Sequence, residues 1–378
     1  MLGYRGSRWR DYPLCDSDVK IHNTFAAASW FAKSRVMAKL WNPAEQSEPH
    51  ILTEIVELTK FDSAALSTVV TGAELEHRRM PGGGSHINLL QCTLPNSVIC
   101  RGRYQPAVLV NGTFARNTIT IGIMLRQSQA TLLNGVDVRM GTVQFYAENA
   151  EMCYRAWPDG TWLAFVISRE RLLRFCLDHF EVVPQLPSSG IVHLEPESQT
   201  QGEELVALLQ DVERSLTPLG TMRNAARLGE SVEYDILARL AGLICRRPCI
   251  RTSDDRGRFN RCQEMLRDAL KLVEDDPDEI LDLHSISRAS GLSPRTLQRM
   301  FQATCGVCPQ EWCRVERLNR VRNDLLDARN VDSVTHTATR WGFFHLGRFA
   351  QYYRELFGER PSETLRAQHG RTALTPSS

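Results

Sequence analysis

The stretch from Leu283 to Pro309 reads LHSISRASGLSPRTLQRMFQATCGVCP, and a second stretch from Val334 to Pro361 reads VTHTATRWGFFHLGRFAQYYRELFGERP. Each contains a helix-like segment, a glycine, a second helix-like segment and then Gly-x-x-Pro. Corresponding positions keep one offset (349 − 297 = 361 − 309 = 52), which pairs Leu297 with Phe349, Phe301 with Tyr353, Gly306 with Gly358 and Pro309 with Pro361. A constant offset over four positions indicates an internal duplication.

The first copy carries local signals for two helices separated by a tight turn. Gly291 tolerates the left-handed backbone that ends a helix, and Ser293-Pro294 supplies an N-cap followed by proline at the first helical position. In the helix that follows, Leu297 and Phe301 lie four residues apart and are predicted to face the core. The other face presents Arg295, Thr296, Gln298, Arg299 and Gln302. Such side chains can bond to base edges in a major groove.

The second copy repeats this pattern of helix, glycine turn and helix. A helix is predicted from Val334 to Arg340, a turn at residues 341–343 and a second helix from His345 to Arg354. Phe349 and Tyr353 repeat the inward pair, and the outward residues are His345, Arg348, Gln351 and Arg354. The sequence therefore predicts two helix-turn-helix units, at about 283–303 and about 333–357.

Charge is consistent with a nucleic-acid partner. Between Arg288 and Arg366 there are thirteen arginines, no lysine and eight acidic residues, whereas the whole chain carries a formal charge of only +1. A basic face contacts phosphates. The plainer alternative is that these side chains only solvate a helical bundle, which the duplicated turns disfavour.

Residues 283–365 resemble the DNA-binding domain of the AraC/XylS family of transcription regulators. The motifs that carry the resemblance are residues 289–301, Gly306 to Pro309, Arg317-Leu318, Gly342-Phe343, Phe349, Tyr353-Arg354, Phe357-Gly358 and Pro361-Ser362. The segment Trp341 to Ala350 looks closest to ethanolamine-operon-type regulators of this family. The resemblance implies a seven-helix, two-lobed domain with two recognition helices in adjacent major grooves.

By position, this resemblance assigns base readers in both lobes. They are Arg295, Thr296, Gln298 and Arg299 in the first lobe, and His345, Leu346, Gly347, Arg348 and Gln351 in the second; the outward-facing Gln302 and Arg354 are further DNA-binding candidates. The second lobe departs from the family pattern at two of these positions, because Gly347 stands where the family often has serine and Gln351 where it often has arginine. The family also implies double-stranded promoter DNA, RNA polymerase and a small-molecule effector as partners, a possible homodimer, and activation rather than repression.

From about Ile51 to Leu194 the sequence pattern is typical of short β-strands. The predicted strands are 66–71, 87–92, 107–110, 118–124, 142–146 and 162–167, and the predicted turns are Pro81 to Gly84, Pro95-Asn96, Asn111-Gly112, Asn134-Gly135 and Pro158 to Gly160. Several short strands at this spacing indicate a barrel or sandwich, and a small barrel encloses a ligand pocket. This pattern resembles the cupin-like sensing domain of the same family.

Helices are predicted to follow at Arg169–Phe180, about Gln201–Leu216 and about Arg223–Arg246. Two apolar stripes on the last two helices, around Leu209 and Ile236, are core or a dimer interface. We therefore expect an α+β chain whose C-terminal domain is all-α. Its predicted parts are an extension at 1–50, a β-rich sensing and dimerisation domain at 51–249, a linker at 250–260, the DNA-binding domain at 261–367 and a disordered tail at 368–378.

The remaining motifs point to no chemistry. Cys305-Gly-Val-Cys308 lacks a second ligand pair, Glu76, His77 and His86 lack a His-x-His pair, and no nucleophile elbow is present. We expect no enzyme, no cofactor and no metal, a cytoplasmic protein with reduced thiols among its eleven cysteines, and no membrane span. The alternatives are a cupin-like barrel enzyme fused to a DNA-binding domain and an architectural DNA binder.

Overall fold

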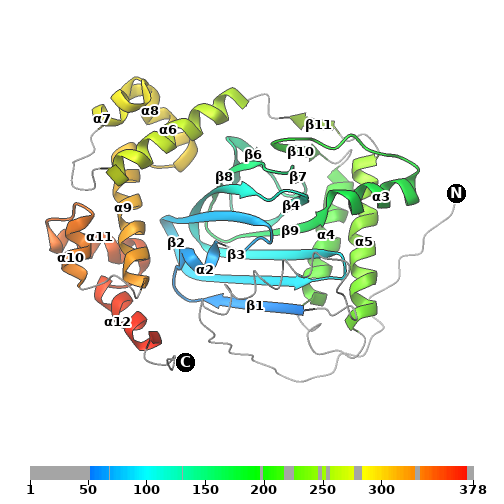
Figure 1. The fold of residues 1–378 in the computed structure, drawn as a ribbon, viewed down its shortest axis with the longest axis horizontal. Coiled ribbons are helices and arrows are strands. Elements are labelled where there is room, and N and C mark those ends of the chain that lie inside the picture. Colours follow the sequence, from blue (N-terminus) through cyan, green and yellow to red (C-terminus); the bar gives the residue numbers. More distant parts are fainter. Residues whose placement is uncertain are drawn as a thin grey trace.

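A computed structural model describes residues 52–67, 69–129, 131–195, 199–216, 225–245, 249–252, 256–275, 283–327 and 333–372. The predicted extension at 1–50 lies outside these residues. A large antiparallel sheet fills the middle of the molecule, helices α3, α4 and α5 cover one side of it, and a helical domain formed by the C-terminal part of the chain lies at the opposite end (Figure 1). No helix among the described residues is long and apolar enough to cross a membrane.

The sheet is built around two long strands. Its members are β1 (Leu52–Leu58), β2 (Ala73–Thr93), β3 (Ser97–Phe114), β4 (Thr118–Arg126), β5 (Thr131–Leu133), β6 (Val136–Val138), β7 (Val143–Tyr146), β8 (Glu151–Ala156), β9 (Gly160–Ser168), β10 (Ile191–Glu195) and β11 (Cys249–Thr252). One edge of β3 pairs with β2 along its length, and the other pairs first with β9 and then with β8. The sheet divides there: β9 continues into β4, β7, β10 and β11, and β8 into β5 and β6.

Two turn predictions in this sheet were wrong. Pro81 to Gly84 lies inside β2, where the register to β3 shifts between Arg79 and Gly83 and again between Gly83 and Ile87. Asn111-Gly112 lies inside β3. A Cβ on Gly112 would lie 2.0 Å from the carbonyl oxygen of Glu74, so this glycine permits close approach of two strands.

The other predicted turns are confirmed. Pro95-Asn96 joins β2 to β3, and Pro158 to Gly160 joins β8 to β9. Asn134-Gly135 joins β5 to β6 with φ of 52° and 81°, the left-handed pair that a two-residue hairpin requires. The strand predicted at 66–71 was wrong. Residues Ser63–Leu66 form the short helix α2, whose N-cap Asp62 accepts a hydrogen bond from the Ala65 amide.

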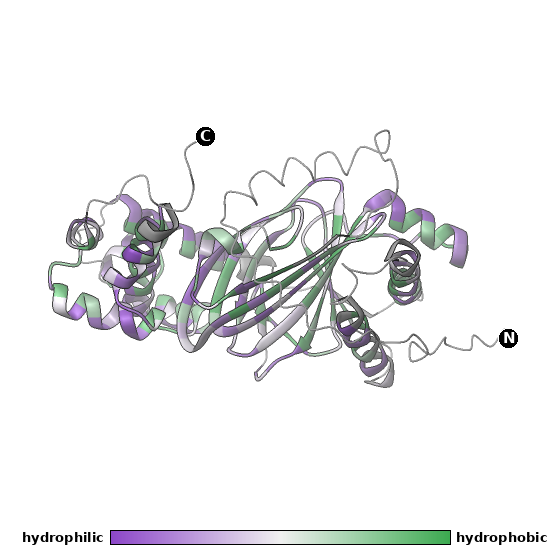
Figure 2. Ribbon diagram, turned by 90° about the horizontal axis from the view of Figure 1, so that it is seen from below, coloured by the Kyte–Doolittle hydropathy of each residue, from purple (hydrophilic) through white to green (hydrophobic). Residues whose placement is uncertain are grey.

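Successive residues on the central strands serve two different cores. On β9, Leu163, Phe165 and Ile167 face the helices, whereas Ala164 and Val166 face the interior of the curved sheet. This period of two is that of a strand, and burial on both faces explains the continuous apolar runs in the sequence. Figure 2 shows hydrophobic colour along the sheet and mixed colour on the surrounding helices.

Helices α3 (Arg169–Phe180), α4 (Gln199–Leu216) and α5 (Ala225–Cys245) confirm the three predicted helices. Ser168 caps α3 by accepting from the Arg171 amide. The described side chains of the two apolar stripes pack within the chain, because they are buried in one cluster with the sheet: Leu209, Val212, Val232, Ile236, Leu237, Leu240 and Leu243. A dimer interface would therefore have to use other side chains.

The C-terminal domain contains α6 (Arg256–Asp275), α7 (Leu283–Ser290), α8 (Pro294–Cys305), α9 (Pro309–Leu326), α10 (Val334–Arg340), α11 (Leu346–Phe357) and α12 (Pro361–Thr372). Residues 250–252 of β11 and the start of α6 lie within the predicted linker at 250–260, and α12 continues to Thr372, so the predicted disordered tail at 368–378 begins in a helix. The expected fold class is confirmed: a β-rich N-terminal part is followed by an all-α domain with two helix-turn-helix lobes.

Candidate nucleic-acid interface

Helix α8 forms because its ends are capped by the signals read from the sequence. The Ser293 side chain accepts a hydrogen bond from the Thr296 amide, and Gly306 ends the helix with a φ of 76°. Leu297 and Phe301 are fully buried, and the Phe301 ring packs on Trp312 of α9 with 5.3 Å between ring centroids. This anchoring fixes which face of α8 points outward.

The predicted readers of the first lobe are not equally placed. Arg295, Gln298, Arg299 and Gln302 are exposed, but Thr296 is half-buried. The Thr296 hydroxyl lies 2.9 Å from the Ser293 hydroxyl within the cap. The amide of Gln302 donates to the Gly306 carbonyl at 3.2 Å. Arg295, Gln298 and Arg299 are thus the side chains of this set for which no internal hydrogen bond is found among the described residues.

Helix α11 presents the second outward face. Phe349 and Tyr353 are buried, and Gly358 ends the helix with a φ of 74°. The predicted readers His345, Leu346, Gly347, Arg348, Gln351 and Arg354 are all exposed. The Gln351 amide donates to the Glu355 carboxylate at 2.8 Å, which holds it along the helix.

Helix α9 connects the two lobes. Its 18 residues give a length of about 27 Å at 1.5 Å per residue. Trp312, Leu318, Val321 and Leu325 are buried in one core cluster with Phe301 of the first lobe and Tyr353 of the second. The packing therefore sets the two recognition helices in a defined relation to each other.

A surface depression of about 690 Å³ lies beside α11. Besides Arg354 and Gln351, it is lined by Thr335 at the start of α10 and by Arg360 and Ser362 at the start of α12. The sequence reasoning did not identify these last three residues. Their predicted position near helix N-termini, which favour anions, was the sequence signal that could have identified them as candidates for contact with phosphate groups.

The curved sheet forms an open half-barrel, here called the barrel, which contacts the helical domain through a buried polar interface. Nε of Arg78 on β2 lies 2.6 Å from Oε2 of Glu316 on α9, and both side chains are almost completely buried. The next amide along β2, that of Arg79, donates to Oδ1 of Asn319 at 2.9 Å, and Nδ2 of Asn319 donates back to the Arg79 carbonyl at 3.0 Å. Arg79 also donates to the Leu356 carbonyl at the end of α11.

A second set of contacts extends this interface to α12. Arg322 of α9 donates through Nε to the Phe61 carbonyl at 2.5 Å and through Nη1 to Glu359 at 2.8 Å. Glu359 also pairs with Lys60, which precedes α2. Burial opposes ionisation of Glu359, but Lys60, Arg322 and Thr364 outweigh it and hold the pKa of that carboxyl below its usual range.

The interface also carries an electrostatic cost. Burial, with a smaller contribution from the Arg322 charge, lowers the pKa of Arg79 to about 10. Nη1 of Arg79 is buried and has no hydrogen-bond partner among the described residues. In contrast, Glu316 and Glu76 outweigh burial and raise the pKa of Arg78. Arg78 thus forms a well-compensated ion pair between the barrel and α9, whereas the neighbouring Arg79 is buried without a carboxylate partner among the described residues.

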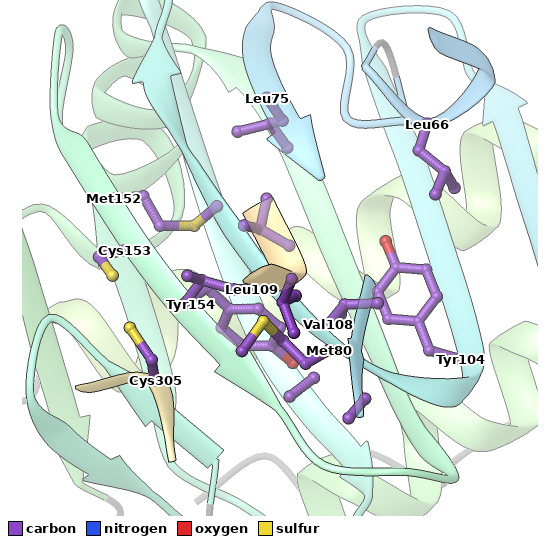
Figure 3. Packing of buried hydrophobic residues seen from close by; sticks show 14 of the residues in the cluster. Leu66, Leu75, Met80, Tyr104, Val108, Leu109, Met152, Cys153, Tyr154 and Cys305 are labelled. Carbon is purple, nitrogen blue, oxygen red and sulfur yellow. The ribbon is translucent and has the colours of Figure 1, made fainter. Parts of the chain in front are cut away.

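Thiols lie at the same boundary. Cys153 of β8 and Cys305 of α8 point toward each other in Figure 3. Both are buried, and burial raises the pKa of Cys153 to about 12 and that of Cys305 well above its ordinary value. Cys308, the other member of the CxxC pair, is exposed. Among the described residues no group of three His, Cys, Asp or Glu side chains could hold a metal ion.

The curved sheet encloses a cavity of about 60 Å³. Its walls are largely apolar, with polar atoms from His77, Tyr104, Thr120, Gln144, Tyr146 and Tyr154. Burial lowers the pKa of His77 to about 3, so its ring is neutral at physiological pH. Its Nε2 lies 3.1 Å from the Tyr104 hydroxyl, whereas its Nδ1, near the Leu75 backbone, and the Tyr154 hydroxyl, near Thr131, make no hydrogen bond of ordinary geometry within the described ranges.

Comparison with known proteins places the helical domain. A family model described as a helix-turn-helix domain matches residues 286–367. XylDLEGF operon transcriptional activator 3 of Pseudomonas putida is 40% identical over 98 residues, which are 26% of this chain and 30% of that protein. XylDLEGF operon transcriptional activator 2 of the same organism is 36% identical over 107 residues, or 28% of this chain and 66% of that protein.

Among solved structures, that of a probable AraC family transcriptional regulator from Rhodopseudomonas palustris CGA009 shares 32% identity. The alignment covers 28% of this chain and 96% of that one, with a TM-score of 0.25. The match to the first Pseudomonas putida activator spans less than a third of that protein's length. The matched family model covers the two helix-turn-helix lobes, and the C-terminal domain they form is similar to those of XylDLEGF operon transcriptional activators, so it is a DNA-binding domain of the AraC/XylS type.

Proposed function

We propose that the chain is a sequence-specific transcription activator that inserts α8 and α11 into adjacent major grooves of promoter DNA under the control of a small-molecule effector. The observation that carries this proposal is the pair of exposed recognition faces fixed by one connecting helix. The length of α9, about 27 Å, is compatible with the roughly 34 Å that separate successive major grooves on one side of B-DNA. The names of the Pseudomonas putida relatives support activation.

The barrel cavity is the proposed effector site. No charged side chain is among its lining residues, and the His77 ring is neutral. An ionised ligand would lose its hydration there without a compensating charge. The proposed effector is therefore a compact, uncharged molecule that accepts or donates hydrogen bonds at His77 Nδ1 and the Tyr154 hydroxyl. A cavity of about 60 Å³ would have to widen for a ring-sized ligand, since benzene occupies an engineered cavity of about 150 Å³.

Strand β2 is the proposed link from effector to DNA. Successive residues of a strand point to opposite faces: His77 lines the cavity, and its neighbour Arg78 binds Glu316 of α9. Among the described residues no hydrogen bond or ion pair joins the barrel to a predicted base reader. Control would therefore act by fixing or releasing α9, rather than by covering the recognition faces. An effector can shift this equilibrium only through different affinities for the two states.

The test is binding of the full chain to DNA sites selected from a random library, measured by fluorescence anisotropy at fixed salt. Insertion of five base pairs between the two half-sites rotates one half-site by about half a turn. If both lobes bind, affinity should fall to that of a single half-site, and Arg299→Ala and Arg348→Ala should each weaken the uninterrupted site. Affinity that is indifferent to spacing would refute binding in two grooves.

A further inference from the structure

The turns of the two lobes differ in length. In the first lobe, Gly291 is followed by Leu292 and Ser293 before α8 begins at Pro294. In the second lobe, Gly342 is followed by Phe343, Phe344 and His345 before α11 begins at Leu346. Both glycines have a left-handed backbone, with φ of 67° and 75°. The second turn thus holds one more residue.

Phe343 takes the place that Leu292 has in the first lobe. Both side chains are partly buried and pack on the core of the domain, and the Phe343 ring lies 5.1 Å from that of Phe349 between centroids. The extra residue is Phe344, whose side chain is 61% exposed. An exposed phenylalanine contributes nothing to the core, so a folding role does not explain it.

The start of α11 continues this apolar surface. Leu346, the first residue of the helix, is 40% exposed. At Gly347 an added Cβ would meet no atom within 4 Å, so the glycine is not required by packing in the chain and leaves the backbone open to close approach. The exposed Arg348 follows on the next position. In helix-turn-helix proteins this N-terminal end of the recognition helix is the part that reaches base edges.

We propose that Phe344 and Leu346 contact the C5-methyl groups of thymines in the half-site bound by the second lobe. This inference rests on the proposed function. The chemistry follows from the base edges: in the major groove the thymine methyl is the apolar group, and alanine, threonine methyl and phenylalanine side chains meet it. The first lobe, with Arg295, Gln298 and Arg299, is suited to the hydrogen-bonding edges of guanine and adenine. The second lobe would therefore read an apolar feature of the operator in addition to the hydrogen-bonding base edges that the exposed Arg348 can reach.

The test replaces single thymines in a selected operator by deoxyuridine, which removes only the methyl group and keeps every hydrogen bond of the base. For the unmodified full chain, replacement at one or two thymines of the second half-site should weaken binding about fourfold each, as expected from the transfer of one methyl group. The same replacement in the first half-site should have a smaller effect.

Variants assign the contact to its residues. Phe344→Ala and Leu346→Ala should weaken binding to the thymine operator and remove the deoxyuridine penalty at their own positions. Arg299→Ala should weaken binding but keep the penalty. Met140→Ala, at a methionine that is 55% exposed on the barrel, is the matched control for loss of an exposed apolar side chain and should leave both quantities unchanged. Circular dichroism verifies that each variant is folded.

The possible failures are distinguishable. Specific binding without any deoxyuridine penalty, or with a penalty that persists in Phe344→Ala and Leu346→Ala, would overturn the inference and leave the proposed function intact. If Phe344→Ala bound DNA normally but failed to activate transcription, the side chain would serve a protein partner and the inference would also be wrong. Failure to select any specific operator would overturn both the inference and the proposed function.

Discussion

Substitution of Glu316 by alanine tests whether the barrel is held to α9 by a buried ion pair. Glu316 accepts from Arg78 at 2.6 Å and from Arg320 at 2.9 Å. Without it, Arg320 keeps Glu274 at 2.7 Å. Among the described residues, Arg78 keeps one carboxylate partner, Glu76, also at 2.6 Å, whose side chain is 47% exposed. A guanidinium that is 3% exposed would then lack its buried counter-ion.

Removal of one partner from a buried ion pair costs about 3–5 kcal/mol. Because Glu76 remains bound to Arg78, we expect the lower end, about 3 kcal/mol. Separation of the barrel from α9 (the open arrangement) rehydrates Arg78. The substitution should therefore destabilise the closed arrangement, in which the two are in contact, and leave the stability of each core unchanged. Since 1.4 kcal/mol corresponds to a factor of ten, the population of the open arrangement should rise roughly 100-fold.

Thiol alkylation reports this opening. Cys153 and Cys305 are buried at the boundary (Figure 3), so their labelling requires separation and its rate follows the open population. Experiments in a Cys308→Ser background remove the exposed thiol nearby. Peptide mass spectrometry should show labelling of Cys153 and Cys305 accelerated roughly 100-fold in Glu316→Ala, with circular dichroism little changed.

The matched control is Glu311→Ala on the same helix. Glu311 pairs with Arg314 at 3.6 Å, and both side chains are more than a third exposed, so the expected cost is below about 1 kcal/mol. Equal labelling rates in Glu316→Ala and Glu311→Ala would refute the argument. The double variant Arg78→Met, Glu316→Leu should recover slow labelling, because an apolar pair of similar volume removes the uncompensated charge.

Three further outcomes are expected. Burial lowers the pKa of His77 from 6.5 to about 3 in the folded state, so the unfolded state takes up a proton first as the pH falls. The free energy of unfolding, measured in urea, should therefore drop by about 2 kcal/mol from about pH 7.5 to about pH 5. His77→Gln should flatten this pH dependence. Arg299→Ala should weaken specific DNA binding by about 1–3 kcal/mol, and unchanged affinity and specificity would exclude α8 from the groove. Gly112→Ala should lower barrel stability by about 1–3 kcal/mol, since its Cβ would clash with the Glu74 carbonyl; a stability equal to that of the unmodified chain would contradict the close strand approach.

The helices that follow residue 168 could be predicted because the signals that begin and end them are local. Ser168, Ser293 and Ser333 each cap a helix through a side-chain hydrogen bond, and Gly306 and Gly358 end helices in the left-handed conformation. Such signals lie within a few residues of the boundary they set. Both helix-turn-helix lobes were readable for this reason.

The sheet was predicted less well because long-range pairing overrides local turn preference. Asn111-Gly112 and Pro81 to Gly84 have turn-forming composition, yet β2 and β3 pair with each other throughout and β3 is covered by β9 and β8 on its other edge. The glycines serve close strand approach and register shifts. A single sequence does not distinguish a glycine in a turn from a glycine that permits close strand approach or a register shift.

The interface between the domains could not be predicted at all. Arg78 and Glu316 are separated by 238 positions, and Arg322 and Phe61 by 261. Each residue alone resembles an ordinary charge on a strand or helix. The contact proposed for Phe344 could not be predicted either, because the duplication identifies the residues that the two copies share and not the one that the second turn adds.

Interference footprinting tests whether both lobes bind the same DNA molecule at once. Selected operator DNA is methylated sparsely at guanine N7, an atom in the major groove, and the molecules still bound by the full chain are separated from those released. If both lobes bind, two clusters of interfering positions should appear about 10 base pairs apart, of which Arg299→Ala affects only the one bound by α8. A single cluster, unaffected by changes in α11, would contradict binding by both lobes.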